Sequence, residues 1–179
     1  MSDSTLEPTT EMADFAAIFA DQRHNFMIPM RTLTEEQART RTTASALTLA
    51  SLVKHVTVTE RNWITTILTP DEDAVFDMAS GADSHTVHAD ETFESLLAAF
   101  QANAKVTDAA LATIDPDQLV PLPVAPWQPE RQWWTARRIL LHLLREISQH
   151  SGHADIIRES LDGANTTYTM GTDAGMDFS

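Results

Sequence analysis

The chain has 179 residues, with 12 Lys and Arg against 26 Asp and Glu, a net charge of −14, and no cysteine. This length fits a single domain over 1–179 with a sizeable core. The acidity argues against nucleic acid and anionic membrane surfaces as partners, and the lack of cysteine excludes disulfides, thiolate metal ligands and a cysteine nucleophile.

The N-terminal segment 1–9 is expected to be frayed, and it lacks the hydrophobic stretch of a secretory signal. No apolar run reaches the length of a transmembrane helix, so none is expected. The absence of cysteine fits a cytoplasmic location. Apolar residues then recur at a spacing of three to four, which predicts a first amphipathic helix over 10–30. His24 on this helix is expected to be a surface or boundary residue rather than a metal ligand. The residues of 34–37 resemble a capping box that opens a short helical turn.

A second helix is predicted over 47–68, where apolar residues again follow a helical period. His55 lies in its middle, and taken alone it reads as a core or boundary histidine. The acidic segment 70–90 follows and is predicted to be a loop. His85 and His88 lie in this loop three residues apart. Such a pair could bind a metal, but without other ligand types nearby we expect both to be solvated.

A third helix is predicted over 91–114. The segment 119–130 contains four prolines and is predicted to be an irregular, extended connection. Trp127, Trp133 and Trp134 cluster around it. They could form a lid on the core or the wall of a pocket.

A fourth helix is predicted over 131–162, with Gly163 as its C-terminal stop. The polar residues of 164–179 predict a loose C-terminal tail. Four helices of this length, with one long crossover before the last, predict an all-α protein that folds as an antiparallel four-helix bundle.

The fourth helix carries the strongest chemical signal in the sequence. His142, Glu146, His150 and His153 fall on one stripe of a helix, less than a quarter of its circumference wide. Burying such groups is costly unless they are paired, hydrogen-bonded or bound to a metal. Glu146 and His150 can bind one ion together, and His55 on a facing helix is the natural third ligand. The alternatives are a buried hydrogen-bond ladder or a partly exposed polar face.

Two segments also carry a family resemblance. They are Glu146-x-x-x-His150-Ser-Gly-His153-Ala-Asp-Ile-Ile-Arg-Glu-x-x-Asp-Gly163, and Leu52-Val-Lys-His55 with Glu60-Arg-x-Trp63. The sequence resembles the DinB/YfiT-like superfamily of helical metalloproteins. Within it, the sequence is most similar to the actinobacterial branch related to mycothiol-dependent maleylpyruvate isomerase. The resemblance implies a four-helix bundle, often a homodimer, with a divalent metal between the second and fourth helices.

The resemblance also implies roles for single residues. His55, Glu146 and His150 match the metal ligands of this branch. His153 falls just beyond the last ligand, and we assign it the role of a catalytic, proton-handling group or of a residue that supports the ligand. His142 lies one turn before Glu146, where it either orients that carboxylate or is a core histidine.

The implied chemistry is thiol-dependent S-transfer or isomerisation, with mycothiol, bacillithiol or glutathione as the small-molecule thiol and an electrophile as the second substrate. Zn²⁺ is the first candidate ion and Ni²⁺ the second. Arg137, Arg138, Arg145 or Arg158 could hold a substrate carboxylate. Two alternative functions stay open. One is a metal-dependent hydrolase, and the other is a non-enzymatic, stress-related metal-binding or scaffold protein.

Overall fold

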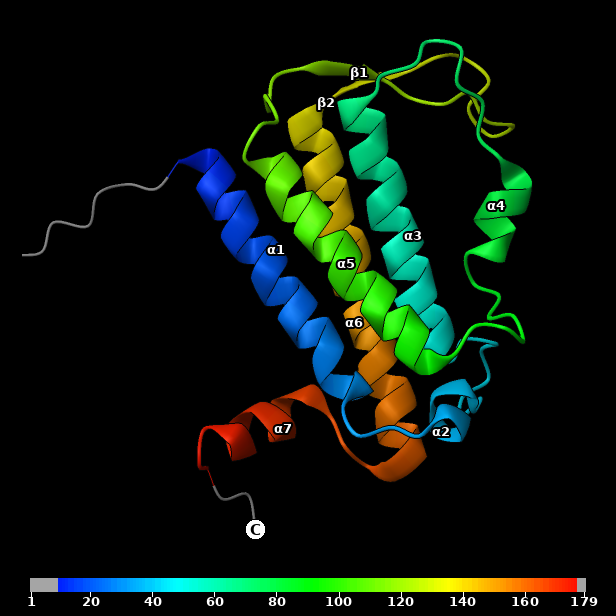
Figure 1. The fold of residues 1–179 in the computed structure, drawn as a ribbon, viewed down its shortest axis with the longest axis vertical. Coiled ribbons are helices and arrows are strands. Elements are labelled where there is room, and N and C mark those ends of the chain that lie inside the picture. Colours follow the sequence, from blue (N-terminus) through cyan, green and yellow to red (C-terminus); the bar gives the residue numbers. More distant parts are fainter. Residues whose placement is uncertain (1–9, 177–179) are drawn as a thin grey trace, which may run out of the picture.

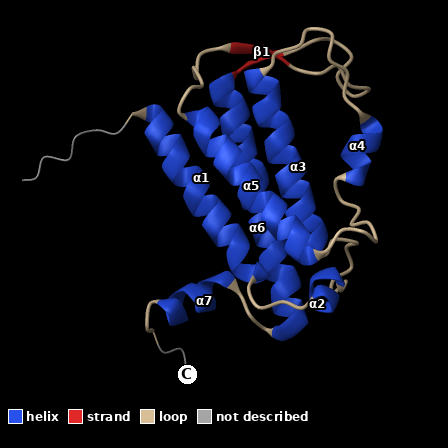
Figure 2. Cartoon of the chain, viewed as in Figure 1, coloured by secondary structure: helices blue, strands red, loops and turns tan. Residues whose placement is uncertain are grey.

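The computed structural model describes residues 10–176, so the frayed start predicted for 1–9 lies outside the described residues. Helices make up most of the described chain, and the only strands in it are two short ones (Figure 2), which confirms the predicted all-α class. The elements, in chain order, are α1 (Glu11–Met27), the 3₁₀ helix η1 (Ile28–Met30), α2 (Glu35–Arg39), α3 (Leu49–Leu68), α4 (Met78–Asp83), α5 (Phe93–Leu111), β1 (Leu119–Pro121), β2 (Trp133–Thr135), α6 (Ala136–Asp162) and α7 (Thr166–Asp173).

The four long helices α1, α3, α5 and α6 pack into one bundle (Figure 1). In this view the chain runs down α1, up α3, up α5 and down α6. Helix α3 packs against both α5 and α6, and α1 packs against α6. Because α3 and α5 run in the same direction, the link 69–92 between them returns along the length of the bundle. This link carries α4 past one side of α3.

Local caps fix where the helices of the site begin and end. Thr48 and Ser51 exchange hydrogen bonds between side chain and backbone, closing a capping box at the start of α3. The Thr135 hydroxyl accepts a hydrogen bond from the backbone N–H of Arg138 at the start of α6. Gly163 ends α6 with a φ of 83°, a conformation that glycine adopts without strain.

The core consists of the apolar faces of the long helices. Side chains with almost no exposed surface include Phe19, Phe26, Leu49, Leu52, Ile139, Leu140, Leu143 and Ile147. Within residues 10–176, no helix has both the length and the apolar character that crossing a bilayer requires.

The connection into the last helix differs from the prediction. Helix α6 begins at Ala136 rather than at 131, because β2 occupies the three preceding residues. Strand β2 is antiparallel to β1, which lies in the segment predicted to be irregular. Aromatic and β-branched residues favour strands. In addition, the backbone N–H of Ala136 donates to the carbonyl of Gln118 at 2.9 Å. The small sheet therefore holds the crossover over one end of the bundle (Figure 1).

Two short helices lie in segments that the sequence predicted to be loops. Helix α4 lies within the acidic segment 70–90 and is capped by Asp77. Helix α7 lies within 164–179, the predicted loose tail, and is capped by Asn165. Both helices begin at a side-chain cap and have few buried apolar residues, so apolar periodicity could not reveal them.

One carboxylate is buried in the bundle beside the core. Glu60 on α3 is 1% exposed, and its Oε1 accepts hydrogen bonds from Thr107 Oγ1 at 2.6 Å and Asn103 Nδ2 at 3.1 Å. Arg23 Nε lies 3.9 Å from its other oxygen. Burial raises the pKa of the Glu60 carboxyl, and the hydrogen bonds and Arg23 oppose that rise only in part. The folded chain therefore favours the protonated form more than the unfolded chain does.

This burial predicts a pH-dependent stability. A carboxyl with a raised pKa in the folded state lowers the free energy of unfolding as the pH rises above its ordinary pKa of 4.5. Glu60→Gln keeps an acceptor oxygen but cannot ionise. We expect its stability relative to wild type to increase between about pH 5 and pH 8, by roughly 1.4 kcal/mol for each unit of pKa rise. Urea unfolding followed by circular dichroism measures this. The exposed control Glu94→Gln should follow wild type, and a Glu60→Gln curve parallel to wild type would contradict the account.

Candidate functional site

The packing of α3 against α6 brings the three predicted metal ligands together. Each of His55, Glu146 and His150 offers one ligand atom, and these atoms lie within 4.8 Å of one another. Nε2 of His150 lies 3.8 Å from a carboxylate oxygen of Glu146. His150 is buried, and the other two are half-buried. Bonds of about 2 Å hold two ligand atoms at most about 4 Å apart, so binding of one ion would draw these side chains slightly closer together.

Hydrogen bonds hold the His55 ring with one nitrogen available. Ser84 Oγ donates to the carbonyl of Gly81 at 2.7 Å, so its lone pairs are left to accept. His55 Nδ1 lies 3.0 Å from this oxygen and is therefore the protonated nitrogen. The Nε2 atom keeps its lone pair, with the Thr59 hydroxyl 3.5 Å away. A histidine that donates a hydrogen bond from one ring nitrogen and keeps a lone pair on the other is typical of histidine ligands to metals.

His150 has a similar support from a different residue. Its Nδ1 atom lies 3.3 Å from Nδ1 of His153, so one of the two nitrogens carries the shared proton. This leaves Nε2 of His150 directed toward Glu146. His153 is half-buried and is not among the described residues that line the cavity beside the site. Its contact with His150 fits the supporting role better than direct contact with a substrate.

The site keeps its histidines neutral. Burial, with the neighbouring His85 and His150 rings, lowers the pKa of His55 to about 3. Burial also lowers the pKa of His150, followed by the effect of His153, although Glu146 raises it. Neutral imidazoles are the form that binds a metal, so both rings can act as ligands at neutral pH.

His142 lies at the wall of a cavity, beside the group formed by His55, Glu146 and His150, which we call the ligand group. Its ring contacts the rings of Trp63 and Trp134 edge-on, at centroid distances of 5.0 and 5.8 Å. Arg145 donates to its Nδ1 atom at 2.8 Å, so Nε2 carries the proton. That nitrogen lies 3.8 Å from Glu146 Oε1. His142 is therefore a half-buried group directed toward Glu146 and not a core histidine.

The loop histidines differ from each other. His88 is exposed and pairs with Asp83 at 2.6 Å, as expected for a solvated residue. His85 is also exposed, but its ring stacks on His55 with centroids 3.8 Å apart. Sequence reasoning therefore missed both His85 and Ser84 as neighbours of the site. The return path of the link 69–92 places both residues beside His55, and apolar periodicity in the sequence does not reveal that path.

Lys54, the residue before His55, fixes this link in place. Its side chain is almost fully buried, and Nζ donates to Asp83, to Glu91 and to the backbone carbonyl of Thr86 at 2.7–3.2 Å. The three acceptors flank Ser84 and His85 in the chain. A buried cation on α3 thus holds the segment that supports its neighbouring histidine.

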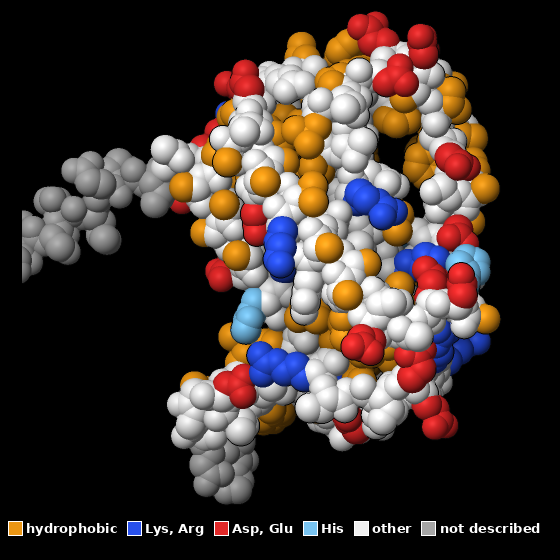
Figure 3. Space-filling view, viewed as in Figure 1, with side chains coloured by type: hydrophobic (Ala, Val, Ile, Leu, Met, Phe, Trp, Pro, Cys, Tyr) orange, Lys and Arg blue, Asp and Glu red, His pale blue; other side chains and the backbone are white. Residues whose placement is uncertain are grey.

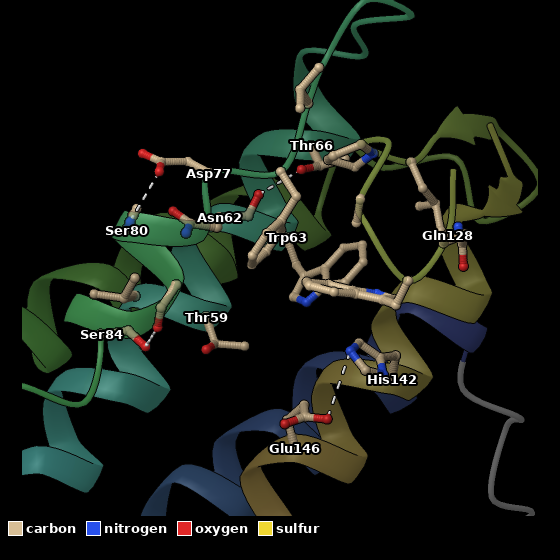
Figure 4. Close-up of a pocket in the computed structure, with 18 of the residues that line it drawn as sticks. Thr59, Asn62, Trp63, Thr66, Asp77, Ser80, Ser84, Gln128, His142 and Glu146 are labelled. Carbon is tan, nitrogen blue, oxygen red and sulfur yellow. Dashed lines mark hydrogen bonds and ion pairs between the residues drawn. The ribbon is translucent and has the colours of Figure 1, made fainter. Parts of the chain in front are cut away.

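A cavity of about 550 Å³ adjoins the ligand group. Its walls come from α3, the link with α4, the crossover and α6. In Figure 3 a hollow with hydrophobic side chains along its border separates the bundle from the segment that carries α4. Figure 4 shows Glu146 and His142 on α6 facing it, with Trp63 above them. His55 and Glu146 line both this cavity and the small space around His150, so the ligand group is open toward the cavity.

The three tryptophans of the crossover differ in whether they line the cavity. Trp127 and Trp134 line the cavity, and Trp133 does not. Neighbouring residues of a strand point to opposite faces, which separates Trp133 from Trp134. The pocket-wall interpretation therefore holds for two of the three.

The four arginines that could hold a substrate carboxylate all contact other groups in the structure. Arg137 forms ion pairs with two carboxylates, and Arg158 donates to two backbone carbonyls near η1. Arg138 lies over an indole ring at 4.0 Å. Arg145 donates to its two neighbours on α6. None of the four is among the described residues that line the cavity.

The hydrogen bond from His55 to Ser84 generates a prediction. Ser84→Ala leaves the Nδ1 proton without its acceptor, so the ring loses its fixed orientation. We expect Zn²⁺ affinity to fall by about 10–100-fold, measured by competition with a chromophoric chelator. Ser80→Ala is the matched control, because Ser80 lies on α4 and lines the same cavity. Equal affinity in wild type and Ser84→Ala would rule out this role.

Comparison with known proteins identifies the fold and the family of the chain. No curated protein matches the chain. Among solved structures, the chain is similar to a crystal structure described as the conserved protein of locus from Enterococcus faecalis, with 15% identity and a TM-score of 0.64. The match covers 88% of this chain and 100% of that one, and at this identity it shows the fold alone. The family described as mycothiol-S-transferase matches residues 14–163. The chain therefore belongs to the mycothiol-S-transferase family, which is DinB/YfiT-like as its sequence motifs predicted.

Proposed function

We propose that this protein is a metal-dependent S-transferase that joins a mycothiol-like thiol to an electrophile. The observation that carries the proposal is the ligand group of His55, Glu146 and His150, which opens onto a cavity large enough for small substrates. Family membership supports the thiol, because the family's name is that of a mycothiol transferase.

The described residues suit a divalent ion, with Zn²⁺ first and Ni²⁺ second. Two neutral imidazoles and one carboxylate form the donor set, and both imidazoles have a partner on the other ring nitrogen. When bound, such an ion would lower the pKa of a thiol that reaches it and so supply a nucleophile at neutral pH. The chain has no cysteine, so the reacting sulfur has to come from the small-molecule thiol.

The protein's own residues position and shield the reaction. In the transfer, the sulfur forms a bond to carbon, the leaving group departs with its electron pair, and the thiol proton passes to a base or to water. His142 holds its Nε2 proton at the cavity wall and can donate it toward a bound substrate or Glu146. The contact with His153 holds the His150 ring with Nε2 toward Glu146. The aromatic side chains of the cavity wall would displace water when a substrate binds.

Two rival functions make different demands. A metal-dependent hydrolase would use water at the same open position and need no thiol. A scaffold protein would use the ion structurally, so chelation would unfold it. The opening toward the cavity favours a reactive role over both a closed structural site and a bare scaffold. A cytoplasmic location and a homodimer remain part of the proposal.

Turnover should depend on both the thiol and the ion. We expect the reconstituted protein to consume mycothiol in the presence of a panel of alkyl and aryl halides, and to release no product without the thiol. Glu146→Gln should lower kcat/KM by at least about 100-fold, because it removes the charged ligand. The control His24→Ala changes an exposed histidine on α1 and should retain wild-type activity. Product formation without thiol would favour the hydrolase.

Removal of the ion separates the transferase from the scaffold. We expect a chelator to abolish turnover while the helical circular dichroism signal and most of the thermal stability persist, since the core is apolar and complete without the site. Re-addition of Zn²⁺ should restore activity. Unfolding on chelation would instead assign the ion a structural role.

A further inference from the structure

The outer wall of the cavity exposes large apolar side chains. Val75, Phe76 and Trp127 line the cavity and yet are 73%, 38% and 65% exposed. They are carried by the link before α4 and by the crossover, which meet at the bridge between Val75 and Val124. Apolar surface held open beside a cavity is typical of a site that binds an apolar ligand.

Aromatic rings form two pairs around the cavity. Phe76 and Trp127 meet edge to face, with ring centroids 5.1 Å apart. Trp63 and Trp134 are nearly parallel, with centroids 6.0 Å apart and planes 3° from each other. All four line the cavity. Flat aromatic ligands gain from stacking and edge contacts with such rings in addition to burial of their apolar area.

The charged side chains in the described lining of the cavity have one sign. Its described lining includes the carboxylates Asp77 and Glu146 and contains no Lys or Arg. Arg131, near this wall, donates to the backbone carbonyls of Ala74 and Leu122 at 3.2 and 2.8 Å and is also absent from the lining. An anionic ligand would therefore find no cationic side chain in the described lining.

Asp77 is the carboxylate nearer to the part of a bound ligand that lies away from the ligand group. Glu146 belongs to the ligand group of the ion, whereas Asp77 stands at the start of α4, across the cavity from it (Figure 4). Both of its hydrogen bonds, from the backbone N–H groups of Ala79 and Ser80, end on Oδ1. The charge at the outer wall is thus fixed in place by a helix cap.

We propose that the cavity selects an uncharged aromatic electrophile, and that Asp77 is the residue that rejects anionic ones. The identification of the ligand as the electrophile rests on the proposed function. The selection itself rests on the aromatic lining and the missing cations.

Two probes of nearly the same shape test the charge selection without turnover. They are 4-nitrophenyl methyl sulfone, which is uncharged, and 4-nitrobenzenesulfonate, which is anionic and a weak metal ligand. Isothermal titration with the protein as purified should give at least tenfold tighter binding of the sulfone, because a charge repelled at close range in partly screened surroundings changes affinity by about this factor. Asp77→Asn should tighten sulfonate binding and so reduce the ratio of sulfone affinity to sulfonate affinity by about tenfold. Asparagine caps helices as well as aspartate does, so α4 is preserved.

A second pair of variants tests the aromatic wall. Trp127→Leu should weaken sulfone binding by about 3–10-fold through the loss of ring contacts. Trp133→Leu is the matched control, because this neighbouring tryptophan is 46% exposed and does not line the cavity. It should bind the sulfone as wild type does.

The outcomes separate this inference from the proposed function. Binding of the sulfone with the expected variant effects supports the inference even if no thiol transfer is found. Equal or tighter binding of the sulfonate overturns it, and so does the absence of sulfone binding or equal effects of Trp127→Leu and Trp133→Leu. Those results would leave metal binding and thiol-dependent turnover to be judged by their own measurements.

Discussion

The site depends on the packing of α3 against α6, which places His55 across from Glu146 and His150. Burying two imidazoles and a carboxylate beside an apolar core is costly unless each group finds a partner. The structure supplies partners on the outer nitrogens, Ser84 for His55 and His153 for His150. The atoms left over are directed at one another, and a shared ion would satisfy all three at once.

The direction of the helices explains why a cavity lies next to this group. Because α3 and α5 run the same way, the link 69–92 has to return along the bundle, and it does so beside α3. Lys54 anchors the link through Asp83 and Glu91. The crossover before α6 meets the link near Val75, so the two connections enclose a space over the ligand group. Connections on a rigid bundle thus form the cavity side of the site.

Much of this arrangement could be predicted from the sequence, because helical periodicity and caps are local signals. The four long helices, the all-α class and the family were predicted correctly. The stripe on α6 and the facing His55 also predicted the three side chains that the structure brings together. The start of α6, the sheet, α4 and α7 were not predicted, since short elements are set by caps and by contacts between distant segments. His85 was expected to be solvated, and its stacking on His55 depends on the path of the link.

The central claim is that His55, Glu146 and His150 hold one divalent ion. Elemental analysis of tag-free protein, reconstituted with Zn²⁺ or Ni²⁺ and freed of excess ion, tests it most directly. Wild type should contain about one ion per chain, and His150→Ala, in which a single ligand is removed, should contain almost none. A wild type without metal, or a His150→Ala variant with the same content, would contradict the account and leave the stripe on α6 as a buried hydrogen-bond ladder.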